Sequence, residues 1–258
     1  MSADGSRVVV GNDVVDMLDP RLRGKPEDAR FVERVLSPSE RHLLDASADP
    51  DLELWCLWAA KEAAYKAVSK LRAEPPVFSH AAFVVDWAGS SAPPVPAARV
   101  RSGVVRFEEA LTHVVVTRSP GALHALAHLS PTPQAPPDLG WGVESLMSPG
   151  APWHGTLPEL MARLSEREQG AVPSLESAAV RIAARAALAS AMHLDEPRLE
   201  IVCDPGPYGR RPPRVCLDGA PAAADVSLSH AGRGIAWTYW VDPNADPRAA
   251  LSPPAAGS

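Results

Sequence analysis

The sequence predicts an α+β fold built from two similar halves, each a small antiparallel sheet with one long helix packed on it. An alanine-rich helical pattern occurs twice, the same helix-start signal precedes it each time, and a short apolar strand and a β-branched hairpin follow it each time. Because each helix-on-sheet unit must bury its apolar faces, the two halves are expected to pack about a pseudo-twofold axis.

Proline-rich segments divide the chain. It has 258 residues and 28 prolines, and the run SPTPQAPP at residues 130–137 cannot hold a helix or a central strand. We therefore expect a first half at residues 1–130, a linker at 131–139, a second half at 140–242 and a disordered tail at 243–258.

The first half begins with a valine-rich strand that leads to Asp13. A serine N-cap with glutamate three residues later, at residues 37–40, then predicts a helix start. The helix at residues 55–70 has one apolar stripe, which is typical of a core-facing surface. The stripe consists of Leu57, Ala60, Ala64, Ala67, Val68 and Leu71. The other face mixes aromatics with charge, so we expect both sides to be covered; it carries Trp55, Trp58, Glu62, Tyr65 and Lys66.

The remaining elements follow in the same order in both halves. In the first half, a strand at residues 82–85 precedes a closing hairpin at 113–129. In the second half, the capping signal recurs at 164–168, the alanine-rich helix begins at 180, and a strand at 199–202 precedes a hairpin at 225–241. Agreement over this many elements indicates an internal duplication.

The halves differ at the positions that carry chemistry. When the helices are aligned, Glu62 falls opposite Arg185 and Lys66 opposite Ala189. In the closing hairpins, residues 117–120 (TRSP) fall opposite residues 229–232 (SHAG). We therefore expect one composite site, with metal chemistry from the first half and anion binding from the second.

Two carboxylates and a lysine form the acidic part of this site. Asp13 ends a strand, and Glu62 and Lys66 lie one helical turn apart. Carboxylates from separate elements with a cation beside them suit a hard metal ion and a phosphate substrate. The alternative is a solvated surface pair on the helix, which is the commoner role of such spacing.

Composition excludes several functional classes. The net charge of −6 argues against bulk nucleic-acid binding. No apolar run approaches the roughly 20 residues of a membrane span, and the N-terminus lacks a secretory pattern. The three cysteines are scattered, without metal or disulfide spacing. These features predict a cytoplasmic protein.

Three segments of the first half carry a family resemblance. They are residues 11–16 (GNDVVD), 30–40 (RFVERVLSPSE) and 60–66 (AKEAAYK). Together they resemble the small holo-acyl-carrier-protein synthases of the 4′-phosphopantetheinyl transferase superfamily. In the second half, residues 208–213 (YGRRPP) and 227–233 (SLSHAGR) resemble the surfactin-type enzymes of the same superfamily, whose Ser-His half comes first rather than second.

The resemblance implies an enzyme that transfers phosphopantetheine from coenzyme A to a serine of an apo carrier protein and releases 3′,5′-ADP. The carrier is expected to be acidic and to belong to acyl, polyketide or peptidyl systems, including fatty-acid or polyketide biosynthesis. The chain is expected to be a monomer with a pseudo-dimeric fold, because a tandem of two units can assemble one site within one chain.

The resemblance also implies the roles of the acidic residues. Asp13 and Glu62 would hold Mg²⁺, and Lys66 would pair with the pyrophosphate. Val15 stands where surfactin-type enzymes carry a further acidic ligand, so two carboxylates are expected rather than three. Asp16 is a candidate for a supporting or structural role, and the general base is Glu62 or a metal-bound water.

Basic residues are implied for the coenzyme A end. Ser229 and His230, with Arg210 or Arg211, would bind its 3′-phosphate and adenine. Arg233 is either a further anion contact or solvated. Lys61, on the other side of the helix, is either a supporting residue or a surface lysine.

The carrier-protein contact would lie on residues 30–34. Arg30, Phe31 and Arg34 place an apolar ring between two cations, which suits an acidic amphipathic helix. The alternative for Phe31 is a role in helix packing. Two further readings of the whole chain stay open: a non-catalytic member that binds coenzyme A or a carrier protein, and a structural or interaction protein whose acidic helix face has no chemical role.

Overall fold

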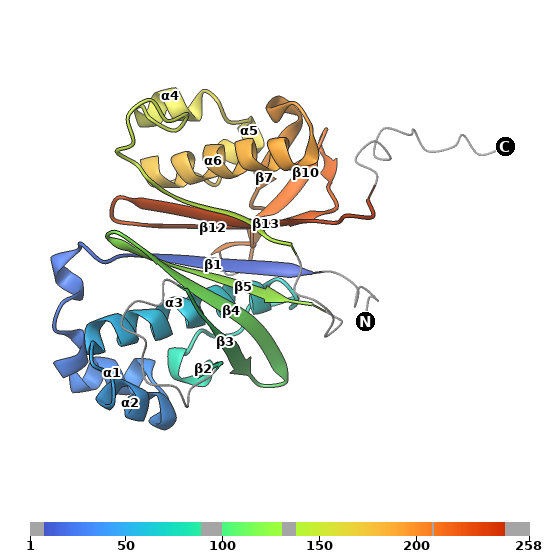
Figure 1. Ribbon diagram of the computed structural model, residues 1–258. Coiled ribbons are helices and arrows are strands. Elements are labelled where there is room, and N and C mark those ends of the chain that lie inside the picture. Colours follow the sequence, from blue (N-terminus) through green and yellow to red (C-terminus); the bar gives the residue numbers. More distant parts are fainter. Residues whose placement is uncertain (1–7, 89–99, 131–137, 208, 246–258) are drawn as a thin grey trace.

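Two sheets lie between two long helices, and the first-half sheet meets the second-half sheet mainly through its edge strand β1 (Val9–Asp16) (Figure 1). The computed structural model describes residues 8–88, 100–130, 138–207 and 209–245. Helix α6 (Leu175–Met192) covers the outer face of the second-half sheet, and helix α3 (Pro50–Ser69) covers the outer face of the first-half sheet (Figure 1). The predicted α+β class, with antiparallel sheets and long packed helices, is confirmed.

The first half forms one five-stranded antiparallel sheet in the order β1-β5-β4-β3-β2. Its strands are β1 (Val9–Asp16), β2 (Val84–Trp87), β3 (Val100–Phe107), β4 (Ala110–Ser119) and β5 (Ala122–Leu129). Its helices are α1 (Ala29–Val35), α2 (Pro38–Asp45) and α3 (Pro50–Ser69), with short 3-10 turns η1 (Pro20–Leu22), η2 (Lys25–Glu27) and η3 (His80–Ala82). The strand expected at residues 82–85 is therefore displaced by two residues, because 80–82 form a 3-10 turn.

The second half has a divided sheet. Strands β12 (Ala224–Ala231), β13 (Gly234–Val241) and β6 (Gly140–Ser145) form one group in that order. Strands β11 (Ala220–Pro221), β10 (Arg214–Leu217) and β7 (Leu199–Val202) form another, and β8 (Pro205–Gly206) pairs with β9 (Gly209–Arg210). The helices are α4 (Leu157–Met161), α5 (Glu166–Gln169) and α6 (Leu175–Met192), followed by η4 (Glu196–Arg198). The order β6-β13-β12 repeats the order β1-β5-β4 of the first half.

Helix α3 is buried on most of its surface, as its mixed sequence predicted. The Asp49 side chain caps its first turn by accepting from the Leu52 N–H at 3.1 Å. Its backbone lies directly against β1, since a Cβ at Gly11 would lie 2.0 Å from the carbonyl oxygen of Ala63. Leu71, expected in the core stripe, is 53% exposed because it lies beyond the end of the helix.

Both predicted capping boxes are present. Ser37 and Glu40 exchange hydrogen bonds at the start of α2, and Ser165 and Glu168 do the same at the start of α5. Each glutamate is fully buried and reaches further than its own helix. The other Glu40 oxygen accepts from the Val85 N–H at 2.8 Å, which ties α2 to the sheet.

The buried glutamates identify equivalent residues in the two halves. Lys61 donates to Glu40 at 2.6 Å and to the Val35 carbonyl at 2.9 Å. Arg185 donates to Glu168 at 2.8 Å and to the Arg163 carbonyl at 2.8 Å. Arg185 therefore occupies the position of Lys61. The sequence alignment that set it opposite Glu62 was wrong by one residue.

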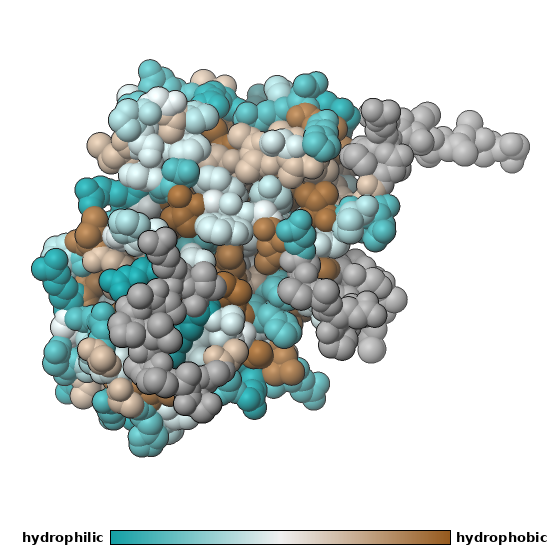
Figure 2. Space-filling model, in the orientation of Figure 1, coloured by the Kyte–Doolittle hydropathy of each residue, from teal (hydrophilic) through white to brown (hydrophobic). Residues whose placement is uncertain are grey.

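The face shown in Figure 2 mixes hydrophilic and hydrophobic residues. The hydrophobic residues form small separate areas rather than one large apolar patch. Among the described residues, no helix has the length and apolar character needed to cross a membrane. Residues 246–258 of the expected tail and 131–137 of the expected linker lie outside the described part of the chain.

Candidate active site

Side chains, rather than a neighbouring main chain, occupy the outer edge of β1. The N–H groups of Val10, Asn12 and Val14 donate to the side chains of Asp225 at 2.7 Å, Ser227 at 3.0 Å and Ser229 at 3.2 Å. The two strands run in the same direction, since each step of two residues on β1 is matched by two on β12. This row of hydrogen bonds fixes the register between the halves.

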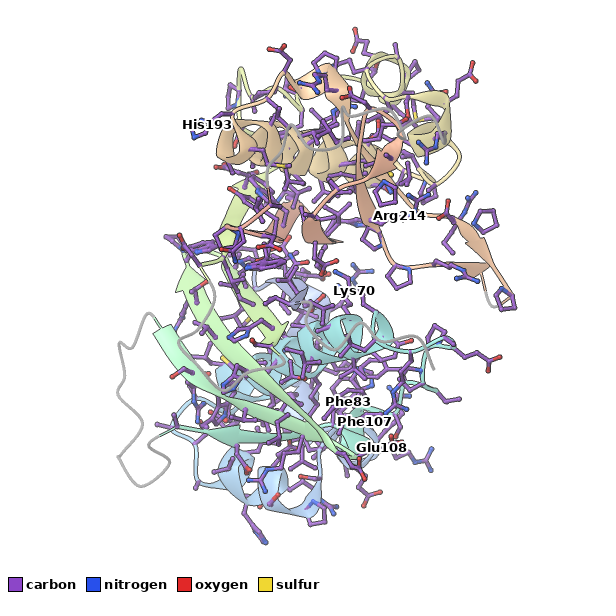
Figure 3. All side chains as sticks on the ribbon, turned by 90° about the vertical axis from the view of Figure 1, so that its right-hand side faces the viewer. Lys70, Phe83, Phe107, Glu108, His193 and Arg214 are labelled. Carbon is purple, nitrogen blue, oxygen red and sulfur yellow. The ribbon has the colours of Figure 1, made fainter. Side chains whose placement is uncertain are left out.

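Lys66 of α3 and Lys70, which directly follows the helix, complete the same edge. Lys66 donates to the Asn12 carbonyl at 2.8 Å, and Lys70 donates to the Val10 carbonyl at 2.7 Å. Lys70 also lies at the boundary between the halves (Figure 3). It pairs across this boundary with Asp225 at 2.8 Å. Backbone polar groups that would otherwise be buried without partners are thereby satisfied.

Asp13, Lys66 and Ser229 meet where this edge lies against β12. The Lys66 ammonium lies 3.0 Å from Asp13 Oδ1 and 3.3 Å from Ser229 Oγ. The Ser229 hydroxyl donates to the same Asp13 oxygen at 3.0 Å. The predicted acidic and Ser-His segments are therefore adjacent, as a composite site requires.

Burial raises the pKa of the Asp13 carboxyl above its usual value. Lys66 opposes the shift, while the neighbouring carboxylate of Glu62 adds to it. Electrostatic repulsion between two nearby carboxylates is relieved when a divalent cation binds them.

The donor set fits Mg²⁺. Asp13 Oδ1 is occupied by Lys66 and Ser229, and Glu62 Oε1 by His80, so each carboxylate keeps a second oxygen without a hydrogen-bond partner in the described residues. Carboxylate oxygens are the ligands that Mg²⁺ prefers, usually one or two of them with water and phosphate. No three histidine, cysteine or acidic side chains lie together as a metal cluster within the described part of the chain.

Glu62 has a partner that the sequence did not reveal. The His80 ring nitrogen Nε2 lies 3.0 Å from Glu62 Oε1. His80 belongs to η3, 18 residues further along the chain, and no spacing rule connects such a residue to the helix. The only signal was a histidine between a proline-rich turn and a strand.

His230 lies at the end of β12 beside this cluster. Burial lowers the pKa of its imidazole, and Glu176, Lys66 and Asp13 lie near enough to act on it. The ring is therefore next to Ser229 and close to both acidic and basic groups. This is the position expected of a residue at the junction of the two halves.

Asp16 ties the β12–β13 turn to β1. Its Oδ2 accepts from the Arg233 N–H at 3.2 Å, and its Oδ1 accepts from the Leu18 N–H at 3.0 Å. The turn approaches closely because Gly232 has φ +54° and no Cβ, which would lie 2.2 Å from the carboxylate. Asp16 thus has a structural position, one of the two roles expected for it, and the Arg233 backbone is held by it.

Arg210 and Arg211 lie on the β8–β9 hairpin. The Arg210 guanidinium donates to the carbonyls of Gly170 and, at 3.2 Å, Cys203. The Arg211 N–H donates to the Asp204 carbonyl at 2.8 Å, and its side chain is exposed. Neither arginine has a hydrogen bond to the Asp13 cluster within the described residues, and Tyr208 of the same motif lies outside them.

Lys61 is not a surface lysine. Its side chain is fully buried, and its three donors go to Glu40, the Val35 carbonyl and, at 3.0 Å, the His80 carbonyl. Burial lowers the pKa of this ammonium, while Glu40 opposes the shift. Lys61 supports η3 and so the segment that contacts Glu62.

The expected carrier contact lies on α1. Phe31 stacks on Trp58 at 5.7 Å between ring centroids, and Lys25 and Arg34 lie over its ring at 5.3 and 5.5 Å. The Phe31 ring is partly buried, so it has a packing role, while Arg30 is exposed.

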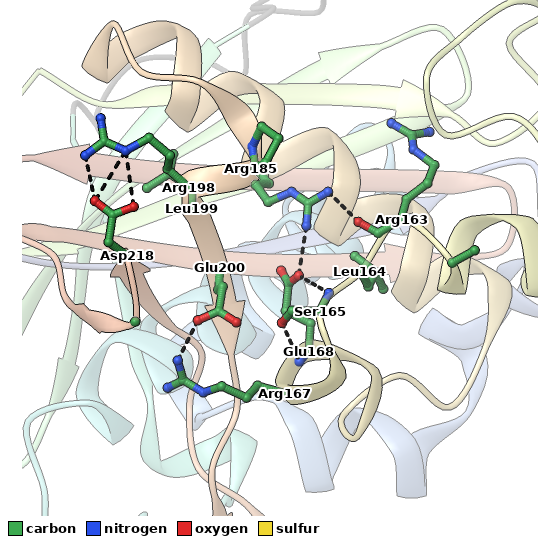
Figure 4. Close-up of a pocket in the computed structure, with 13 residues that line it drawn as sticks. Arg163, Leu164, Ser165, Arg167, Glu168, Arg185, Arg198, Leu199, Glu200 and Asp218 are labelled. Carbon is green, nitrogen blue, oxygen red and sulfur yellow. Dashed lines mark hydrogen bonds and ion pairs between the residues drawn. The ribbon is translucent and has the colours of Figure 1, made fainter.

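A shallow depression of about 580 Å³ lies elsewhere, on the second half (Figure 4). Three of the four arginines that line it are paired with carboxylates: Arg167 with Glu200, Arg185 with Glu168, and Arg198 with Asp218. The fourth, Arg163, donates to the Pro152 carbonyl. None of the predicted site residues lines it, so it is separate from the Asp13 cluster.

Comparison with known proteins supports the resemblance. Residues 9–97 match the family model of the 4′-phosphopantetheinyl transferase superfamily. No curated protein matches the chain. The matched segment contains β1, α1, α2 and α3, and so includes Asp13, Glu62 and Lys66. The superfamily resemblance of the first-half motifs, all of which lie within residues 9–97, is thus confirmed by the family model.

Proposed function

We propose that this protein transfers 4′-phosphopantetheine from coenzyme A to a serine of an acidic apo carrier protein, with Mg²⁺ as cofactor. The observation that carries the proposal is the meeting of Asp13 and Lys66 with Ser229 of the other half, at 3.0 and 3.3 Å. The superfamily match supports a transferase, and this contact between the halves supports one composite site.

The acidic residues would act at the pyrophosphate. Mg²⁺, held by Asp13 and Glu62, would neutralise charge on the phosphate oxygens. Lys66 uses all three donors within the protein, and its longest bond, to Ser229, is the one it would exchange for a pyrophosphate oxygen.

The carrier serine would attack the β-phosphorus, forming a new P–O bond as the bond to 3′,5′-ADP breaks. Glu62 is the carboxylate available to accept the serine proton. His230, with Arg210 or Arg211 and Arg233, would bind the 3′-phosphate and adenine end of coenzyme A. Ser229, given the same role by the sequence motif, is bonded to Asp13 and Lys66, so its position favours orienting the acidic cluster.

The carrier would dock on α1. The exposed Arg30 and the cations that flank Phe31 suit an acidic helix.

A monomer would suffice, because both halves of the site come from one chain. The buried ion pair of Glu40 with Lys61 matches that of Glu168 with Arg185. This match favours a duplicated origin of the halves and a pseudo-twofold relation between them.

Intact-mass spectrometry tests the proposal. Apo acyl, polyketide and peptidyl carriers are incubated with the protein, coenzyme A and Mg²⁺, and a gain of one phosphopantetheine mass is expected, lost with chelator and with Glu62→Gln. Glu109→Gln, an exposed turn residue, is the matched control and should transfer normally. No gain with any carrier, despite measured coenzyme A binding, would establish instead a non-catalytic binding member of the superfamily.

A further inference from the structure

His80 contacts the carboxylate that the proposed function places at the reaction centre. Its Nε2 lies 3.0 Å from Glu62 Oε1. An ionised carboxylate only accepts hydrogen bonds, so the imidazole is the donor. One oxygen of Glu62 is thereby fixed, and the other has no hydrogen-bond partner in the described residues.

The imidazole itself is held from both faces. Its centroid lies 4.0 Å from that of Trp58 and 4.1 Å from that of Phe78, at interplanar angles of 31° and 42°. Only 16% of the side chain is exposed. A ring packed between two aromatic rings cannot change rotamer without disturbing its neighbours.

The backbone of His80 is fixed as well. Its carbonyl accepts from the buried Lys61 ammonium at 3.0 Å, and Lys61 is anchored to Glu40 at 2.6 Å. The helix residue before Glu62 thus positions the turn that carries His80, and His80 in turn positions Glu62. Both contacts bind η3 to the same stretch of α3.

Glu62 needs such a restraint. A glutamate has three rotatable side-chain bonds, and repulsion from the Asp13 carboxylate opposes any approach of the Glu62 carboxylate to it. A hydrogen bond to the oxygen farther from a ligand is the usual way in which proteins orient metal-binding carboxylates.

We propose that His80 is a positioning residue that fixes the Glu62 carboxylate for metal binding and transfer. This inference rests on the proposed function. His80 does not touch the substrate in this scheme; it acts through Glu62 by a hydrogen bond from a ring held between Trp58 and Phe78.

The test separates the hydrogen bond from the packing. His80→Phe keeps a ring between Trp58 and Phe78 and removes the donor, whereas His80→Gln keeps an N–H donor. Mn²⁺ affinity is measured by water-proton relaxation, and kcat and KM for coenzyme A are measured with an apo carrier. His42→Gln, an exposed histidine on α2, is the control.

For His80→Phe we expect Mn²⁺ affinity and kcat to fall by about tenfold or more, with the KM for coenzyme A unchanged, and partial recovery in His80→Gln. Circular dichroism melts confirm that each variant is folded, and if His80→Phe is unfolded, His80→Leu, which also lacks a donor, replaces it. Wild-type Mn²⁺ affinity and kcat in a folded His80→Phe protein would overturn the positioning role alone. A wild-type chain that neither binds Mn²⁺ nor modifies any carrier would overturn the proposed function and this inference with it.

Discussion

The Ser229 hydroxyl donates to Asp13 Oδ1 at 3.0 Å although 216 positions separate the two residues in the chain. The same hydroxyl accepts from the Val14 N–H and lies 3.3 Å from the Lys66 ammonium. One side chain of the second half therefore orients the carboxylate and the cation that the first half supplies.

Replacing Ser229 with alanine should slow transfer more than it weakens coenzyme A binding. Loss of hydrogen bonds to charged groups costs about 1.5–3 kcal/mol, which corresponds to a fall in kcat of about 10- to 100-fold. His230→Ala should instead raise the KM for coenzyme A more than it lowers kcat. Steady-state kinetics of the two variants check this, and identical patterns in both would contradict the separation of roles.

Replacing Lys70 with methionine should destabilise the whole protein. The Lys70 and Asp225 side chains are almost fully buried, and the variant removes the cation that donates to Asp225 and to the Val10 and Val226 carbonyls. Breaking such a pair costs about 3–5 kcal/mol in the free energy of unfolding. Urea titration followed by tryptophan fluorescence measures the loss.

The matched control for Lys70 is Arg72→Met. The Arg72 pair with Glu108 is exposed, with side-chain exposures of 36% and 58%, and is expected to contribute less than about 1 kcal/mol. Equal losses in the two variants would show that the Lys70 contact is not a structural link between the halves.

Mild acid should destabilise the protein through His124. Burial lowers the pKa of this imidazole to about 3, and its Nε2 lies 3.2 Å from the Asn12 amide. Between about pH 6.5 and pH 3 the unfolded chain binds a proton that the folded chain does not, so stability falls as the pH falls through this window. At pH 5 the loss from this group is about 2 kcal/mol relative to neutral pH.

Urea unfolding at pH 7.5 and pH 5.0 measures the His124 effect. The difference between the two values should shrink by about 2 kcal/mol in His124→Gln, which keeps a polar group beside Asn12. His42→Gln, on an exposed surface, should leave the difference unchanged. An unaltered difference in His124→Gln would assign the acid sensitivity to other groups.

Gly11→Ala should prevent stable folding. The new methyl group would lie 2.0 Å from the Ala63 carbonyl oxygen and 2.9 Å from the Ala67 nitrogen, and both are helix backbone atoms. Because neither can move without shifting α3, we expect a loss of more than about 3 kcal/mol in unfolding free energy. Gly170→Ala, whose added carbon has its nearest neighbour at 3.8 Å, should melt at nearly the wild-type temperature. A normally stable Gly11→Ala would mean that β1 and α3 are not in direct contact.

The sequence was informative wherever a short pattern determines the structure. Serine and glutamate three residues apart predicted both capping boxes, and the mixed faces of residues 55–70 predicted a helix covered on several sides. The first half carries the acidic residues and the second half the Ser-His segment, and this difference predicted that Asp13 would lie near the Ser-His segment. These inferences need only local spacing and the repeat.

Other features depend on contacts between distant elements, which no local pattern encodes. His80 reaches Glu62 only because η3 folds back on α3. The equivalence of Lys61 with Arg185 was missed because the alanine-rich helices align almost equally well one residue apart, and only the buried glutamates decide the register. The sequence assigned no role to Lys70, because its partner Asp225 lies 155 positions further along the chain.

The side-chain row along β1 also bears on aggregation. An open strand edge can recruit a strand from another molecule, and natural proteins protect such edges. Here the outward N–H groups at positions 10, 12 and 14 are already bound by Asp225, Ser227 and Ser229, so folded chains would meet a saturated edge rather than a template. The residues that unite the halves thus also protect the molecule against edge-to-edge self-association.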